Sequence, residues 1–372
     1  MESYRDRGRS RRSERTAAGD ARRGGVSTGR GSVTGRFITA TVVAVGVSDR
    51  NSTDSPLEAV SGGDSSRAAE AFGALSNETR LAILLALWEA YSPAAPDEGV
   101  SFSELRQRVD MRNSGRFNYH LGELEGQFVR KTDDGYVLRR AGRRLVRTVI
   151  AGTGIEEPTF EASEIDVPCP ICDAATEIRY EDDRLYQVCT ECQGAFEGHE
   201  AQPEGYLAGI ALDPAGFTDR TAGEMWAAAR VRAFQNVRSM IEGVCDECSG
   251  PAGGSLAVCD DHDPDGVCEA CGRRSAPMAF LGCSVCKNYH VMSPRTIVAH
   301  HPAVVAFYHE HGVDVQFDVD DFESVRRRVS LVGDHDQEVV STEPPRVRVV
   351  VSYDGDELRL TVDEELDVTV TD

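Results

Sequence analysis

The chain has 372 residues, enough for two or three domains that each bury a core. Its 40 basic and 62 acidic residues give a net charge of −22, and Lys131 and Lys287 are the only lysines, a composition typical of a salt-loving, GC-rich source. Most of the carboxylates are interpreted as a solubilising surface. No apolar run reaches the roughly 18 residues of a membrane-spanning helix, so we expect no membrane partner.

Charge is distributed unevenly along the chain. Residues 1–50 hold 11 basic and 5 acidic residues, and residues 67–150 hold 13 and 11, whereas residues 151–372 hold 16 and 43. The segment 67–150 is therefore the one predicted folded part that is not strongly acidic. A module that contacts DNA needs this property, because neutralisation of phosphates supplies most of the affinity.

Residues 1–66 are rich in Arg, Ser, Gly and Thr and show almost no hydrophobic periodicity, which predicts a disordered tract. One interpretation is a basic arm that adds non-specific affinity for nucleic acid. The other is a translation artefact, with Met1 lying upstream of the true start. We favour the artefact, because a Lys-free, Arg-rich composition is typical of an arbitrary GC-rich reading frame.

Residues 67–151 are predicted to form three helices and a hairpin, the order of a winged helix-turn-helix. Ser76 or Asn77 is a good N-cap for a first helix whose apolar residues fall at helical spacing. Asp134-Gly135 between two apolar runs is a strong hairpin signal. The further predicted elements are helices over 103–109, about 115–125 and about 141–151, and strands over 128–131 and 136–138.

Two stretches carry a family resemblance. Leu-Ser-Asn-Glu-Thr-Arg-Leu-Ala-Ile-Leu at 75–84 resembles the opening helix of ArsR-type winged-helix regulators. Phe-Asn-Tyr-His-Leu at 117–121, followed by Leu124 and Phe128-Val129, resembles their recognition helix running into the wing. The resemblance covers about a fifth of the chain, and the whole layout resembles haloarchaeal proteins in which zinc-ribbon segments follow the winged helix.

The resemblance implies a cytoplasmic transcription regulator that binds double-stranded DNA as a homodimer. ArsR-type metal sensors often carry ligand cysteines in the second helix. Here that helix, residues 103–109, has no cysteine, which argues against metal sensing at that site. The later histidines 290, 300, 301, 309 and 311 have no fixed ligand spacing and are interpreted as exposed helix residues.

In helix-turn-helix proteins the early residues of the recognition helix face base edges in the major groove. Arg can bind guanine and Asn can bind adenine, so Arg116 and Asn118 are the expected base-reading residues. Basic residues around the wing are expected to hold phosphates or a minor groove, the alternative being an ordinary solvated hairpin. The residues expected at the DNA are Arg112, Asn113, Ser114, Arg116, Asn118, Tyr119, His120, Arg130, Lys131, Arg139 and Arg140.

All eleven cysteines lie between residues 169 and 286, and ten of them form C-x2-C pairs. Two thiolates at this spacing can bind one ion from a tight turn, and two such turns complete a tetrahedron. The eleventh, Cys259, precedes His262 by three residues. The count therefore gives up to three Zn²⁺ sites of four ligands each. The predicted ligands are Cys169, Cys172, Cys189, Cys192, Cys245, Cys248, Cys259, His262, Cys268, Cys271, Cys283 and Cys286.

The first four ligands flank two predicted strands and form a zinc ribbon. Two pairings of the other eight stay open. Taken in sequence, the ligands at 245, 248, 259 and 262 bind one ion and those at 268, 271, 283 and 286 bind another. In a cross-brace, the first and third pairs share one ion and the second and fourth share the other. We favour the sequential pairing, because each short loop suits a separate ribbon.

Other cysteine chemistry is disfavoured. An intracellular regulator keeps its thiols reduced, thioredoxin-like redox chemistry needs a βαβ setting, and catalytic zinc usually has three protein ligands and an open position. We therefore predict structural ions that supply folding energy to small, acidic segments. No nucleophile–base set, Walker loop or dinucleotide fingerprint appears, so we do not expect an enzyme.

The predicted fold class is α+β, with a winged helix-turn-helix followed by small zinc-ribbon β domains, a connecting helix and a C-terminal β-hairpin. After residue 151 we expect an acidic linker at 152–168, a zinc ribbon at 169–200, a helical connector at 201–244, two further zinc segments at 245–290, a helical and acidic region at 291–343 and the hairpin at 344–372.

The expected function is a DNA-binding transcriptional regulator, whose zinc segments are structural or bind a partner or effector. The alternative is a zinc-stabilised protein-interaction adaptor of the transcription machinery, which docks a protein through its acidic zinc region and does not itself read DNA sequence.

Overall fold

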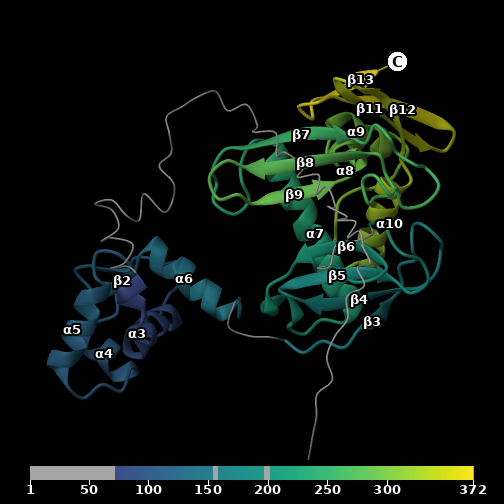
Figure 1. Cartoon of the computed structure of the whole chain (residues 1–372). Coiled ribbons are helices and arrows are strands. Elements are labelled where there is room, and N and C mark those ends of the chain that lie inside the picture. The colour runs from purple at the N-terminus through teal and green to yellow at the C-terminus, as the bar shows by residue number, and fades with distance from the viewer. Residues whose placement is uncertain (1–71, 154–157, 197–201, 372) are drawn as a thin grey trace, which may run out of the picture. The chain divides into compact units, whose positions relative to one another are not determined.

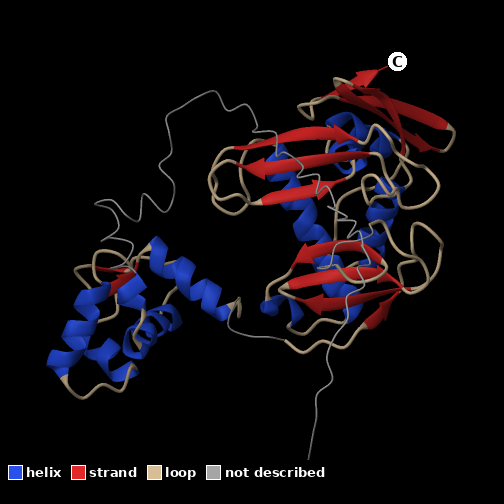
Figure 2. Ribbon diagram, viewed as in Figure 1, coloured by secondary structure: helices blue, strands red, loops and turns tan. Residues whose placement is uncertain are grey.

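The computed structural model describes residues 72–153, 158–196 and 202–371, and the predicted disordered tract 1–66 lies outside them. The fold is α+β, as predicted: helices with a small hairpin come first, and small antiparallel sheets with helices between them follow (Figures 1 and 2). Within the described ranges, none of the helices combines the length and the apolarity that a membrane crossing requires.

The first part consists of α3 (Glu78–Glu89), α4 (Phe102–Arg108), α5 (Ser114–Leu124), the hairpin β1 (Val129–Lys131) and β2 (Tyr136–Leu138), and α6 (Arg140–Ile150). Helices α3, α4 and α5 start at side-chain N-caps, since Asn77, Ser101 and Asn113 each accept a hydrogen bond from a backbone N–H of the first turn. The predicted helices and hairpin are confirmed.

Apolar side chains of α3, α4, α5 and the hairpin build one core. Ile83, Leu84 and Leu105 are 0% exposed, and so are Phe117 and Leu124 of α5. These α5 positions recur at helical spacing, so one face of the helix is buried and the opposite face is free for contacts.

The second part begins with a four-stranded antiparallel sheet in the order β3-β4-β5-β6. Its strands are β3 (Ser163–Ile165), β4 (Thr176–Glu181), β5 (Arg184–Cys189) and β6 (Tyr206–Ala211), and the short η1 (Pro214–Phe217) leads into α7 (Ala222–Ile241). Trp226 of α7 is 1% exposed in the core behind this sheet, and its indole N–H donates to Gln187 Oε1 at 2.9 Å.

A larger core joins a three-stranded sheet and a four-stranded sheet. The first is β7 (Ala252–Val258), β8 (Pro277–Cys283) and β9 (Tyr289–Met292), and the second is β10 (Asp336–Thr342), β11 (Pro345–Tyr353), β12 (Asp356–Val362) and β13 (Val368–Thr371). Between them come α8 (Pro294–Val298), α9 (Pro302–Glu310) and α10 (Phe322–Gly333). Alternate residues of β11, Val347, Val349 and Val351, are fully buried in this core.

Helix α7 serves both cores of this second part. Its first half places Met225, Trp226 and Ala229 in the core of the first sheet, and its second half places Val237 and Met240 in the larger core. The helix therefore packs along its whole length, from the core of the first sheet to the larger core.

Three segments differ from the sequence-based expectation. The linker 152–168 contains β3, and the helical connector 201–244 begins with β6, so both segments extend the sheet of the first zinc ribbon. The segment 291–343, expected to be helical and acidic, ends with β10, which joins the C-terminal sheet beside the confirmed hairpin of β11 and β12, and β13 completes this sheet on the other side.

Candidate metal centres

Four of the five C-x2-C turns share one local structure. In these four, the N–H of the first cysteine donates to the carbonyl five residues later, at 2.8 to 3.0 Å, and the residue after the second cysteine has a φ of 61 to 67°. The left-handed residue reverses the chain, so that both thiols point to the same side. The turns begin at Cys169, Cys245, Cys268 and Cys283.

The structure groups the twelve predicted ligands into three clusters, within each of which the ligand atoms lie within 4.8 Å of one another. We name them centre 1, centre 2 and centre 3. Centre 1 is Cys169, Cys172, Cys189 and Cys192; centre 2 is Cys245, Cys248, Cys283 and Cys286; centre 3 is Cys259, His262, Cys268 and Cys271.

Both pairings expected for the last eight ligands are wrong, because centre 3 is nested inside centre 2. The cause is the register of a hairpin. Strands β7 and β8 pair with Ala252 opposite Cys283, which brings the turn that precedes β7 to the turn that follows β8. The residues between the two strands then hold their own four ligands.

The donor sets and their spacing fit zinc. In a tetrahedron with Zn–S bonds of about 2.3 Å, two sulfurs lie about 3.8 Å apart. The observed Sγ–Sγ distances are 3.7 Å for Cys169 and Cys192 and 3.6 Å for Cys245 and Cys286. In centre 3, His262 Nδ1 lies 3.5 Å from Cys271 Sγ. The three groups are therefore compatible with three ions, and a zinc ion in each would hold two turns together and supply folding energy.

Backbone N–H groups stabilise the thiolate form of one ligand in centre 1 and one in centre 3, and a metal requires this form. Burial alone would raise the pKa of Cys189, but N–H donors of Cys192 and Glu191, at 3.3 and 3.4 Å, outweigh it and help lower the pKa to about 7. The pKa of Cys268 is lowered to about 6, chiefly by the backbone hydrogen bond from Asp263.

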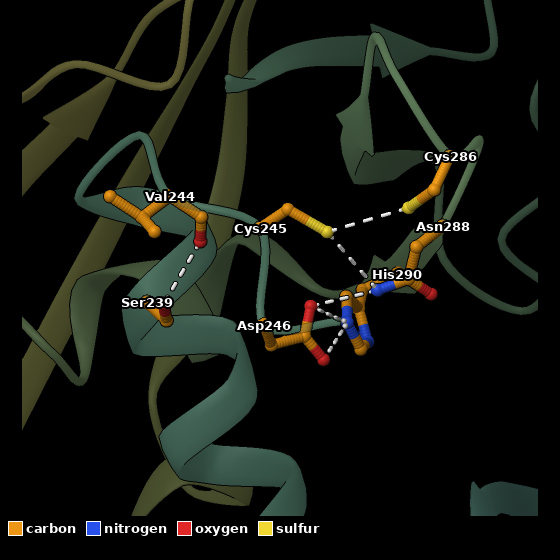
Figure 3. A network of polar contacts seen from close by, with 7 residues as sticks. All are labelled: Ser239, Val244, Cys245, Asp246, Cys286, Asn288 and His290. Atoms are coloured by element: carbon orange, nitrogen blue, oxygen red, sulfur yellow. Dashed lines mark hydrogen bonds and ion pairs between the residues drawn. The ribbon is translucent and has the colours of Figure 1, made fainter. Parts of the chain in front are cut away.

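Centre 2 has a polar support beside its ligands. The carboxylate of Asp246 accepts from Asn288 Nδ2 at 2.7 Å and lies 3.3 Å from His290 Nε2. Figure 3 shows Asp246 directed at both side chains, next to Cys245. In the same view Ser239 Oγ donates to the Val244 carbonyl at 2.9 Å, which ties α7 to the residue directly before the first ligand. Such supports orient metal ligands.

The residues expected at DNA occupy the surface of the first part except His120, and one of the exposed residues, Asn113, is already engaged as a helix cap. Asn113 is the N-cap of α5, and its side-chain oxygen accepts a hydrogen bond from the backbone N–H of Arg116 at 2.9 Å. His120 is 5% exposed, on the side of α5 that packs into the core, so it does not face a groove. Its position follows from helical spacing, since residue 120 lies three positions after the buried Phe117.

The other nine side chains are exposed. They are Arg112, Ser114, Arg116, Asn118 and Tyr119 on and just before α5, and Arg130, Lys131, Arg139 and Arg140 around the hairpin. Arg130 is paired with Asp97, and Arg139 donates to the Gly126 carbonyl. Among the ion pairs of the described part of the chain, none includes Arg112, Arg116, Lys131 or Arg140.

Comparison with known proteins gives two family matches. Residues 166–368 match a family described as Domain of unknown function (DUF7351), and residues 68–149 match one described as Domain of unknown function (DUF7347). The first match contains all three metal centres, and the second contains the helices and the hairpin of the first part. No curated protein and no solved structure matches the chain.

Proposed function

The chain belongs to the family described as Domain of unknown function (DUF7351), and from that premise we propose that it is a cytoplasmic DNA-binding transcriptional regulator. Residues 72–151 form an ArsR-like winged helix-turn-helix that binds duplex DNA in a homodimer. The zinc centres hold the second part in its fold. The observation that carries this proposal is the exposed face of α5, together with the unpaired basic residues that border it.

The surface of the first part supports contact with phosphates. Arg112 and Arg116 lie at the start of α5, where the helix dipole is also positive. Lys131 lies in the wing and Arg140 begins α6. These four cations are exposed on the part of the chain that is not strongly acidic. Phosphate contacts from such residues give most of the affinity for DNA.

The central stripe of the exposed α5 face is open. Gly115, Asn118, Tyr119 and Gly122 fall on it at helical spacing, opposite the buried Phe117 and its neighbours. A Cβ at Gly122 would meet no atom within 4 Å, and one at Gly115 would meet only Asn113 Oδ1 at 3.4 Å. The fold itself therefore does not require these two glycines. A helix without side chains at these points can approach the floor of a groove closely, and Asn118 is then in reach of an adenine.

The test is genome-wide occupancy in the source cell at its native salt, for the intact protein and for the double variant Arg116→Ala/Asn118→Ala. Loss of a bidentate base contact costs about 1–3 kcal/mol, so discrete upstream peaks should vanish in the double variant. The matched control is Arg346→Ala, which removes an exposed cation from β11 in the second part and should leave the peaks unchanged.

Zinc content and melting temperature establish that each variant is folded. If the intact, zinc-loaded protein gives no peaks, direct DNA binding is refuted. The protein would then act as an adaptor that docks a protein partner.

A further inference from the structure

We propose that centre 3 is an exchangeable zinc site, whereas the ions of centres 1 and 2 are permanent parts of the fold. Occupancy of centre 3 orders the loop 193–196 that follows the last ligand of centre 1. The inference concerns zinc and loop order alone, so it stands whether or not the chain binds DNA.

The position of centre 3 in the chain is the first observation. All four ligands lie between β7 and β8, in residues 259–276. The two strands pair continuously from Ala252 opposite Cys283 to Val258 opposite Pro277. The insertion is thus the loop of an already complete hairpin. Its ligands span 13 residues from Cys259 to Cys271, and loss of the ion there removes a local cross-link without opening the sheet.

Centre 2 contrasts with this arrangement. It joins the segment after α7 to the turn between β8 and β9, and Cys245 and Cys283 are 1% and 6% exposed members of the larger core. Asn288 and Asp246 support it from the side (Figure 3). Release of this ion would expose core residues, so zinc binding and folding are coupled there.

Centre 1 is also built into a sheet. Cys189 is the last residue of β5, and its N–H donates to the Gly205 carbonyl at 2.8 Å, next to the start of β6. Cys169 is 3% exposed. An ion in centre 1 would therefore join turns that are continuous with the strands of this sheet.

The surroundings of centre 3 favour the arrival of cations. Cys259, His262 and Cys271 are partly buried, whereas Cys268 is 1% exposed. Exposed carboxylates of Asp260, Asp261, Asp263 and Asp265 surround His262 in the sequence. Their negative potential raises the local concentration of cations and speeds their arrival.

Centre 3 is connected to the loop after centre 1 through Arg274. The Nε2 of His262 lies 3.2 Å from the Arg274 carbonyl, so the ligand ring is held by this residue. Arg274 in turn donates from its backbone N–H to the Ala195 carbonyl at 3.2 Å and from Nε to the Gly194 carbonyl at 2.7 Å.

The neighbouring Arg273 continues this connection, since it pairs with Phe196 in an antiparallel bridge. The loop 193–196 therefore takes partners from Arg273 and Arg274, two and three residues after the last ligand of centre 3, in addition to the bond from the Ala195 N–H to the Tyr206 carbonyl at 2.7 Å. Loss of order around centre 3 would remove those partners.

The experiment counts zinc by native mass spectrometry while the intact protein is exposed to EDTA. We expect a species with two ions to accumulate before any further loss. The variant Cys271→Ser should contain two ions as purified and should melt close to the unaltered protein. The matched variant Cys248→Ser changes the same position of a C-x2-C turn in centre 2, and it should melt at a clearly lower temperature.

Hydrogen–deuterium exchange tests the second half of the proposal. Residues 193–196 should exchange faster in Cys271→Ser than in the unaltered protein. Arg274→Gln should give the same faster exchange while all three ions stay bound. Simultaneous loss of the three ions, or equal destabilisation by Cys271→Ser and Cys248→Ser, would overturn the exchangeable site. Unchanged exchange at 193–196 in both variants would overturn the connection.

Discussion

Substitution of Gly122 tests the proposed DNA binding separately from folding. The glycine lies in α5, and its φ is not in the left-handed region. A Cβ there meets open space. Gly122→Ala should therefore stabilise the free protein by up to about 1 kcal/mol, the usual difference in helix propensity between the two residues. Gly122→Gln should give a similar gain, because glutamine is also a good helix former.

The same substitution should oppose binding in proportion to the length of the side chain. A methyl group should have little effect on affinity, whereas the glutamine side chain projects from the stripe that also carries Asn118 and Tyr119. We expect a loss of at least roughly tenfold in affinity, equivalent to about 1.4 kcal/mol. Melting temperature and fluorescence anisotropy with an operator duplex, both at high KCl, measure the two effects.

Gly333→Gln is the control, because this glycine ends α10 in the second part and a Cβ there also meets nothing within 4 Å. It should leave affinity unchanged. If Gly122→Gln bound DNA as tightly as the unaltered protein, the α5 stripe would not face the groove. A fall in stability for Gly122→Ala would instead show that the space above the helix is not open.

Two further predictions concern the second part. Burial, aided by Arg328 and Arg295, lowers the pKa of His335 from 6.5 to about 4. At a pH between these two pKa values, His335 is protonated in the unfolded chain and neutral in the folded chain. His335 should therefore lower the free energy of unfolding by about 2 kcal/mol as the pH falls from 7 to 5. His335→Gln should reduce the pH dependence of urea unfolding by that amount, and an unchanged slope would refute the assignment. At the start of α7, Thr221 and Glu224 form a capping box, with Glu224 Oε2 accepting from the Thr221 N–H at 2.7 Å. Thr221→Ala should destabilise the protein by about 1 kcal/mol in denaturant unfolding, and a change within error would contradict a contribution from the cap.

The local structure of the metal ligands could be predicted from sequence, but their partition between ions could not. Each of the five C-x2-C pairs, and the pair of Cys259 and His262 at the same spacing, specifies its own turn, so all twelve ligands can be identified from spacing alone. Any two turns can complete a tetrahedron, however. The choice was made by the pairing of β7 with β8, and β7 reads Ala-Gly-Gly-Ser-Leu-Ala-Val, in which two glycines hide the strand pattern.

The first part shows the same limit at the level of single side chains. Helix periodicity and the Asp134-Gly135 turn were sufficient to predict α3, α5 and the hairpin. Helical spacing puts His120 on the same face as Phe117, but its residue type did not indicate burial, because histidine occurs both on surfaces and in cores. In the structure it packs beside the core residue Leu121, and burial lowers its pKa, with Arg80 and Arg116 adding to the effect.

The sharing of α7 between two cores has a consequence for modularity. A break in this helix would leave Trp226 and Met240 on separate pieces, each with half of a buried surface. Neither sheet could then be transplanted or deleted as a cassette, although the first carries centre 1 and the β7–β9 sheet carries centres 2 and 3. The two sheets should thus be gained, lost and unfolded together, and a single calorimetric transition for the whole second part would be its signature.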